Sequence, residues 1–343
     1  VSTINSGTPN RLIRWAFDEV NFNPNKPFQL VWFGWAGDGT NWVDGVPNID
    51  WFAIAKYNPN VAVSLSSGII TITNNSGSTL TDYQISVLAS QLGVTSTDEG
   101  LFISHSQFKQ VPLKFSTKKL GFVKSSAIKY QYYWLEHDQN NNPTGNVWVK
   151  LSLPKRSSKT LSIIKTTTSD ATANNYHDGS WVFVLFDDFD SLDTTKWDTT
   201  NKSSILQITD GKLYISSNAS AHSGAWVISK QPLDLSNNYG LIALANKVNV
   251  GGSGGPQVQL GFTDKTVQET TYYNLYYSVV GIGPWSYSGT QYLRIAYHNS
   301  SSQQSTLAVN LFNSWTFYSF EYFRTAQKLK GRAKAGGTIY TVT

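Results

Sequence analysis

The acidic residues of this chain gather most closely where Asp187, Asp188 and Asp190 precede Asp193. Carboxylate oxygens are hard ligands of the kind that Ca²⁺ binds. The alternative is that these residues are ordinary turn aspartates. The spacing alone leaves both interpretations open.

The other residue types that commonly carry catalysis form no recognisable arrangement. The five His are isolated, and no His-x-His or His-Glu-x-x-His spacing indicates zinc. No Gly-x-Ser-x-Gly segment is present to carry a nucleophilic serine. Glu321 stands alone between aromatic residues, which favours a surface or hydrogen-bonded role. The sequence therefore predicts a protein that is not an enzyme and has no certain cofactor.

Aromatic residues offer a different chemistry, because the chain has 12 Trp and 18 Tyr. Exposed rings can stack on the faces of sugars, and two segments are candidates for such a platform. The candidate glycan-binding residues are Trp35 and Trp42 in one segment and Trp285 and Tyr287 in the other. The alternative is that these rings fill a β-sheet core, where aromatics bury a large area.

Glycosylation sequons occur at Asn74, Asn201, Asn218 and Asn299. Chance alone produces some sequons in a chain this rich in Asn, Ser and Thr. Together they favour secretion and predict a glycoprotein at the cell surface, outside the cell or on a virion.

Composition points in the same direction. Charged residues make up 14% of the 343 residues, against about a quarter in typical soluble domains. The chain lacks both Cys and Met. The absence of these oxidation-prone residues fits a harsh, oxidising or hot environment outside the cell, such as the surroundings of a thermophile. A chain that does not begin with Met is expected to be processed or part of a longer one.

Charge and hydropathy also exclude some partners. The net charge is +5, but the basic residues are scattered and do not interleave with aromatics as in nucleic-acid-binding proteins. No apolar run approaches the roughly 18 to 20 residues of a membrane span. We expect neither a nucleic-acid partner nor a membrane span.

Short alternating runs separated by Gly, Asn, Asp and Ser clusters predict an all-β chain. The length suits two domains of about 100 to 200 residues each. The one helix candidate is a short turn over residues 82–91, and its β-branched content weakens it.

The middle of the chain resembles the DUF2341 family. The resemblance begins at residues 70–85 (ITITNNSGSTLTDYQI), where a strand ends in an Asn/Ser/Gly turn and returns through Tyr-Gln. It continues through residues 133–136 (YWLE), 147–151 (VWVKL) and 181–189 (WVFVLFDDF). The loop at residues 166–170 departs from the family pattern. We assign residues 61–185 to this antiparallel β-sandwich.

Residues 186–343 resemble a concanavalin A-like jelly roll of the laminin G or glucanase type, a module that often follows DUF2341. Residues 186–197 (FDDFDSLDTTKW) are similar to its first strand and turn, and residues 317–322 (FYSFEY) to a late strand. Its final strand is similar to residues 48–57 (NIDWFAIAKY), at the other end of the chain. The resemblance therefore implies a circularly permuted order in which residues 1–57 complete the jelly roll of the same or a neighbouring chain.

Two expectations about chemistry follow from this resemblance. Jelly rolls of this type often hold one structural Ca²⁺, which implies a metal site formed by Asp187, Asp188 and Asp50. Glucanases of the class carry Glu-x-Asp-x-x-Glu on one strand, a spacing that places acid and nucleophile on one face. No such motif occurs here.

A jelly roll without its last strands would expose long apolar edges that template aggregation. A neighbouring copy could fill them by donating its strands, and such head-to-tail contacts build open filaments. The sequence therefore predicts a non-enzymatic structural subunit of an extracellular filament, pilus-like appendage or coat, whose partners are copies of itself. Permutation within one chain is the other arrangement. The alternative function is a monomeric, lectin-like adhesin module that binds surface glycans.

Overall fold

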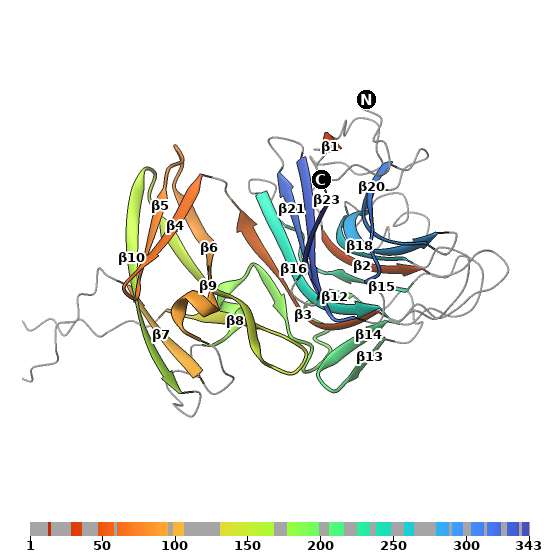
Figure 1. Ribbon diagram of the computed structural model, residues 1–343, viewed down its shortest axis with the longest axis horizontal. Coiled ribbons are helices and arrows are strands. Elements are labelled where there is room, and N and C mark those ends of the chain that lie inside the picture. Colours follow the sequence, from red (N-terminus) through yellow and green to blue (C-terminus); the bar gives the residue numbers. More distant parts are fainter. Residues whose placement is uncertain are drawn as a thin grey trace, which may run out of the picture. The chain divides into compact units, whose positions relative to one another are not determined.

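The computed structural model divides the chain into two compact units (Figure 1). Unit 1 comprises residues 1–56 and 186–343, and unit 2 comprises residues 57–185. The structure describes residues 13–14, 29–35, 47–57, 60–94, 99–105, 131–167, 177–198, 206–215, 225–233, 238–247, 257–263, 279–287, 290–297, 303–311, 314–323, 328–335 and 338–342. The described residues lie overwhelmingly in antiparallel strands, which confirms the all-β class.

The described part of unit 1 contains two sheets. The nine-stranded sheet has the order β1 (Ile13–Arg14), β22 (Lys328–Ala335), β21 (Thr316–Phe323), β16 (Asn238–Lys247), β3 (Pro47–Tyr57), β14 (Lys212–Ile215) and β13 (Leu206–Thr209), with β11 (Leu185–Asp187) beside β3 and β23 (Thr338–Val342) beside β22. The seven-stranded sheet has the order β12 (Trp197–Asp198), β15 (Ala225–Ser229), β2 (Gln29–Trp35), β17 (Gln257–Thr263), β18 (Val279–Tyr287), β19 (Thr290–Tyr297) and β20 (Gln303–Ala308).

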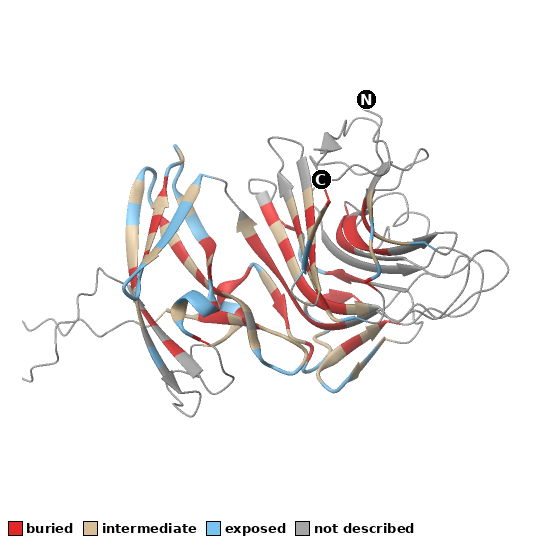
Figure 2. Cartoon of the chain, in the orientation of Figure 1, coloured by how far each residue is buried: buried red, intermediate tan, exposed pale blue. Residues whose placement is uncertain are grey.

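The first 56 residues supply interior strands to both sheets of unit 1. β2 lies between β15 and β17, and β3 lies between β16 and β14. Figure 1 shows β3 in the red-orange of the early sequence beside the green and blue strands of the late sequence. All residues of β3 from Ile49 to Ala55 are buried (Figure 2). β3 is buried on both faces, so its run of apolar residues is continuous rather than alternating.

Aromatic rings form the centre of the unit 1 core. Trp51, Phe52, Phe189 and Trp197 are at most 1% exposed. The ring centroid of Phe52 lies 5.0 Å from that of Trp197 and 5.7 Å from that of Phe189. Residues from both segments of unit 1, 1–56 and 186–343, thus share one core, and each buried aromatic contributes a large apolar area.

Unit 2 is formed by a four-stranded and a three-stranded sheet in the described residues. The first has the order β4 (Val61–Ser66), β5 (Ile69–Asn74), β10 (Ser157–Thr167) and β7 (Glu99–His105). The second has the order β6 (Leu80–Leu88), β9 (Pro143–Leu153) and β8 (Tyr133–His137). A 3₁₀ helix, η2 (Ala89–Leu92), follows β6, and one turn of α-helix, α2 (Gly179–Val182), precedes β11. A single apolar cluster drawn from both sheets forms the core.

Tight turns fix the register of two hairpins. Ser67 and Gly68 both have positive φ, at 48° and 75°, between paired residues Ser66 and Ile69. Asp210 and Gly211 repeat the arrangement in the β13–β14 hairpin, with φ of 52° and 65°. Two consecutive left-handed residues match the twist of antiparallel strands, and Gly adopts this region without strain.

The helix candidate over residues 82–91 is wrong over most of its length. Strand β6 extends to Leu88, and only the short η2 follows. Tyr83, Ile85 and Val87 are buried at every second position and join the core, which is strand periodicity. The described residues contain no helix that is long and apolar enough to cross a membrane.

Candidate functional site

Three of the four predicted glycan-binding residues lie on one face of the seven-stranded sheet. Trp35 and Trp285 both pair with Gln257, and Trp285 also pairs with Tyr292, so these four positions form one row across β2, β17, β18 and β19. Tyr287 lies two positions beyond Trp285 on the same strand. Directly paired positions share a face of a sheet, as do positions two apart. Trp42 lies outside the described residues.

The opposite face of the same sheet packs in the core. Leu260, Ile282 and Ile295 each lie three positions from a member of the row and are fully buried. A Cβ added to Gly331 of β22 would come within 2.7 Å of the Cδ1 atoms of Ile282 and Ile295, so the nine-stranded sheet covers that face closely. The row therefore lies on the sheet face opposite this core. Arg294 shares the face of the row, pairs with Gly283 and is 5% exposed.

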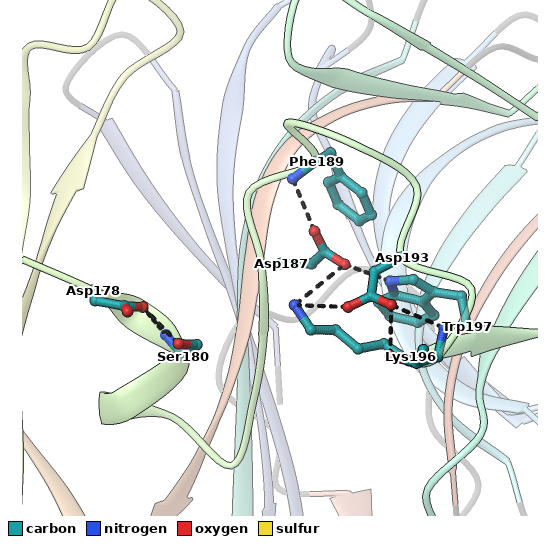
Figure 3. A network of polar contacts seen from close by, with 8 residues as sticks. Asp178, Ser180, Asp187, Phe189, Asp193, Lys196 and Trp197 are labelled. Carbon is teal, nitrogen blue, oxygen red and sulfur yellow. Dashed lines mark hydrogen bonds and ion pairs between the residues drawn. The ribbon is translucent and has the colours of Figure 1, made fainter.

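The predicted metal ligand Asp187 is engaged by the protein itself (Figure 3). Its Oδ1 accepts the backbone N–H of Phe189 at 3.0 Å, and its Oδ2 accepts the indole N–H of Trp197 at 2.6 Å. Lys196 Nζ lies 3.9 Å from the same Oδ2 and 3.7 Å from Asp193. Burial raises the pKa of Asp187, and the hydrogen bonds from Trp197 and Phe189 oppose that effect.

The other aspartates of this stretch have separate surroundings. Asp193 accepts the backbone N–H and the hydroxyl of Thr195, and these hydrogen bonds lower its pKa. Burial, and then the charge of Asp190, raise the pKa of Asp188. Asp50 is buried in β3 at 7% exposure. No three His, Cys, Asp or Glu residues of the described chain lie close enough together to hold a metal ion. The contacts of Asp187 and Asp193 favour structural turn aspartates, and calcium binding stays a prediction.

The sequon residue Asn74 is fully buried. Its Nδ2 donates to the carbonyls of Ser78 at 2.9 Å, Leu153 at 3.3 Å and Pro154 at 2.9 Å. Its Oδ1 accepts the backbone N–H of Ser76 at 2.9 Å. These bonds occupy Nδ2, the atom to which a glycan would be attached. They favour a structural role for Asn74 in the β5–β6 turn, and glycosylation at Asn74 stays a prediction. Asn201, Asn218 and Asn299 lie outside the described residues.

A buried carboxylate in unit 2 was not identified from the sequence. Glu136 of β8, 7% exposed, accepts the indole N–H of Trp148 at 2.6 Å and the backbone N–H of Asn146 at 2.8 Å. The Asn146 amide adds contacts at 3.1 and 3.2 Å. Several donors thus compensate the desolvation of this carboxylate. A buried carboxylate whose oxygens are occupied in this way is expected to have a structural role.

Two histidines far apart in sequence meet at one tryptophan in unit 2, which sequence reasoning also missed. The ring of Trp134 stacks on His177 with centroids 4.8 Å apart and planes at 6°, and His137 meets it edge-on at 5.3 Å. His177 Nε2 accepts the backbone N–H of Leu135 at 3.1 Å. Burial lowers the pKa of His177 to about 4, and the nearby charge of His137 adds to the effect.

Glu321, the isolated acid of the late strand, forms an ion pair in unit 1. Its Oε1 lies 3.6 Å from Nη1 of Arg332 on the neighbouring strand β22. This contact accounts for Glu321 as a structural residue.

Comparison with family profiles gives one match. The profile described as domain of unknown function (DUF2341) matches residues 116–200. Comparisons with curated proteins and with solved structures gave no match. The match includes Glu136, His177 and the Asp187–Trp197 pair. Residues 116–200 of this chain are therefore similar to the DUF2341 family. This confirms the DUF2341 resemblance for residues 116–185 of the predicted module, and the match extends to residue 200 in the segment predicted as a jelly roll.

Proposed function

We propose that the protein is a non-enzymatic structural subunit of an extracellular assembly, in which residues 1–56 of one copy complete unit 1 of the next copy. One observation carries this proposal: β2 and β3 are interior strands of two different sheets, yet both come from the N-terminal segment. A segment that supplies an interior strand to each of two sheets suits strand donation.

Without this segment, residues 186–343 cannot form the described sheets. Loss of β2 separates β15 from β17, and loss of β3 separates β16 from β14. The core would also lose Trp51 and Phe52, which are at most 1% exposed, and burying one such ring contributes about 2 to 3 kcal/mol. The segment is therefore required, whichever copy provides it.

Unit 2, residues 57–185, separates the segment from the rest of unit 1 along the chain. The segment of a second copy has the same sequence and can make the same contacts, so exchange needs no new interface within unit 1. When each copy gives its segment to the next and receives one from the previous, the contact is heterologous and builds an open filament.

A cysteine pair tests this, because the natural chain contains no cysteine. Positions 48 and 214 are directly paired between β3 and β14. We expect the Asn48→Cys/Tyr214→Cys variant, treated with a short bis-maleimide, to give a ladder of covalent oligomers. A mixture of the two single variants should give covalent dimers, and neither single variant alone should do so through this pair. Exclusive formation of internally linked monomers would refute strand exchange.

A second candidate function, glycan binding by a self-contained module, is favoured by the row of Trp35, Gln257, Trp285 and Tyr292. Aromatic and amide residue types in one row across the sheet can provide ring stacking and hydrogen bonds, the two interactions that sugars require.

Binding to a panel of neutral and acidic polysaccharides, measured by affinity electrophoresis and calorimetry, tests this candidate. Trp35→Ala and Trp285→Ala should each weaken binding at least about tenfold, which corresponds to roughly 1.4 kcal/mol. Trp181→Ala is the matched control, because Trp181 is 56% exposed and belongs to unit 2. Equal affinities for all three variants would refute this site.

A further inference from the structure

The outer edge of strand β8 is closed by a segment that follows much later in the chain. β8 is the last strand of the sheet β6-β9-β8, and an edge strand has backbone groups without a sheet partner. The backbone N–H of Asp178 donates to the carbonyl of Tyr133 at 3.0 Å, and the N–H of Leu135 donates to His177 Nε2 at 3.1 Å. We call residues 177–183 the strap.

Only neutral imidazole can make the second of these bonds. Nε2 accepts the hydrogen bond that Leu135 N–H donates, so the ring proton of the neutral form belongs on Nδ1. A protonated ring carries hydrogens on both nitrogens and has no acceptor. Protonation would therefore place two N–H donors against each other at 3.1 Å and leave Leu135 N–H without its partner.

We propose that His177 makes the strap an acid-releasable seal, which covers the edge of β8 at neutral pH and uncovers it in mild acid. The uncovered edge then presents Tyr133 C=O and Leu135 N–H, the groups through which another extended strand can pair. The switch is local, because it needs only residues 177 and 178 to leave the edge.

The rest of the strap has its own attachments and serves as the fixed end. Val182 is fully buried, and its carbonyl accepts the side-chain N–H of Gln84 at 2.8 Å. Phe183 packs on Trp148 with ring centroids 5.5 Å apart. None of these contacts involves a group that titrates near neutral pH.

The charged and titratable groups around His177 determine the direction of the switch. His137 on β8 opposes a positive charge on His177, whereas Asp178 favours it. Tyr133 packs against the ring at 5.2 Å and is neutral in this range, because burial raises its pKa. Stacking on Trp134 would favour the cation by about 1 kcal/mol. Burial outweighs these favourable contributions, so the sealed state holds His177 neutral with a pKa of about 4.

Hydrogen exchange on the full chain tests the seal. After correction for intrinsic exchange rates, the Leu135 amide should exchange about tenfold faster for each pH unit between about 6.5 and 4. The amide of Val149 in the interior strand β9 is the internal control and should not follow this trend. Unchanged protection of Leu135 over the whole interval would overturn the proposal.

Two variants assign the effect to His177. In His177→Gln, the side-chain carbonyl can accept from Leu135 N–H and does not titrate, so Leu135 should stay protected at pH 4. His137→Gln keeps the Leu135 bond and should keep the pH-dependent opening. Persistence of the wild-type opening in His177→Gln would contradict the proposal.

A measurement on the unaltered protein covers the case in which His177→Gln does not fold. Nitrogen NMR of the His177 ring should show an unprotonated Nε2 at pH 7, and its titration should coincide with the loss of Leu135 protection. A protonated Nε2 at pH 7 would overturn the proposal without any substitution.

Discussion

The carboxylate-bearing side chain of Glu136 lies directly over Gly145 on the neighbouring strand. A Cβ at position 145 would come within 2.6 Å of the Cβ of Glu136 and 2.9 Å of its Cδ. The absence of a side chain at position 145 therefore lets Glu136 reach the indole of Trp148 and the backbone of Asn146.

Gly145→Ala should consequently displace Glu136 and leave a buried carboxylate with fewer donors. We expect a loss of about 2 kcal/mol or more in the free energy of unfolding of unit 2, measured by urea denaturation. Gly77→Ala is the matched control, because no atom lies within 4 Å of its added Cβ, and its effect should stay within about 0.5 kcal/mol. Equal effects of the two substitutions would contradict this role for Gly145.

Asn74→Ala should destabilise unit 2 by about 2 to 3 kcal/mol, because the carbonyls of Ser78, Leu153 and Pro154 lose one shared donor. Asn75→Ala, at an exposed neighbouring position, should have little effect. Mass spectrometry of protein from a glycosylating host should find Asn74 unmodified. Stoichiometric glycan on Asn74 of the folded protein would show that this geometry is wrong.

Trp197→Phe should retain most of the ring packing in unit 1 but remove the donor to Asp187. We expect it to lower the free energy of unfolding by about 1 to 3 kcal/mol. Lys196→Met is the comparison: its Nζ is 3.9 Å from Asp187 and its side chain is 33% exposed, so its effect should be below about 1 kcal/mol. Thermal denaturation of the two variants should rank them in this order, and the reverse order would contradict the prediction.

The stability of unit 2 should fall as the pH is lowered from about 6.5 to 4. The folded-state pKa of His177 is about 4, and that of an unfolded histidine is near 6.5, so the unfolded chain binds the extra proton in this interval. The free energy of unfolding should drop by up to about 3 kcal/mol, because each pKa unit is worth about 1.4 kcal/mol. Urea titrations at several pH values would measure the slope, which should flatten in His177→Gln.

The sequence was informative where a pattern is local. Alternating runs identified the strands, and Ser-Gly and Asp-Gly pairs stand at the hairpin turns of β4–β5 and β13–β14. The turn interpretation of Asp187 and Asp193 also follows from local sequence, because each accepts a backbone N–H from two residues further along the chain. The helix candidate failed because residues 82–91 were judged without the sheet partners that bury Tyr83 and Ile85.

Contacts between residues far apart in the sequence could not be predicted from local patterns. Nothing near His177 indicates that its ring faces Trp134, because the two lie on elements joined only by tertiary packing. The sequon at Asn74 has the right residue types, but its burial depends on carbonyls near residue 154. Trp35 and Trp285 likewise lie in one row only because both pair with Gln257 on the strand between them, which local patterns do not indicate.

The interior position of β3 also orders events during synthesis. Residue 49 pairs with residue 213, and residue 13 pairs with residue 329, so the first segment leaves the ribosome long before its partner strands exist. Unit 2 is complete by residue 185. Because synthesis proceeds at about 5 to 20 residues per second, unit 2 can fold while the later strands of unit 1 are still being made. The many long-range pairings of unit 1 then make its closure the slow step. During that delay, the apolar stretches that later form β2 and β3 are available to chaperones, or to a neighbouring chain made from the same messenger RNA.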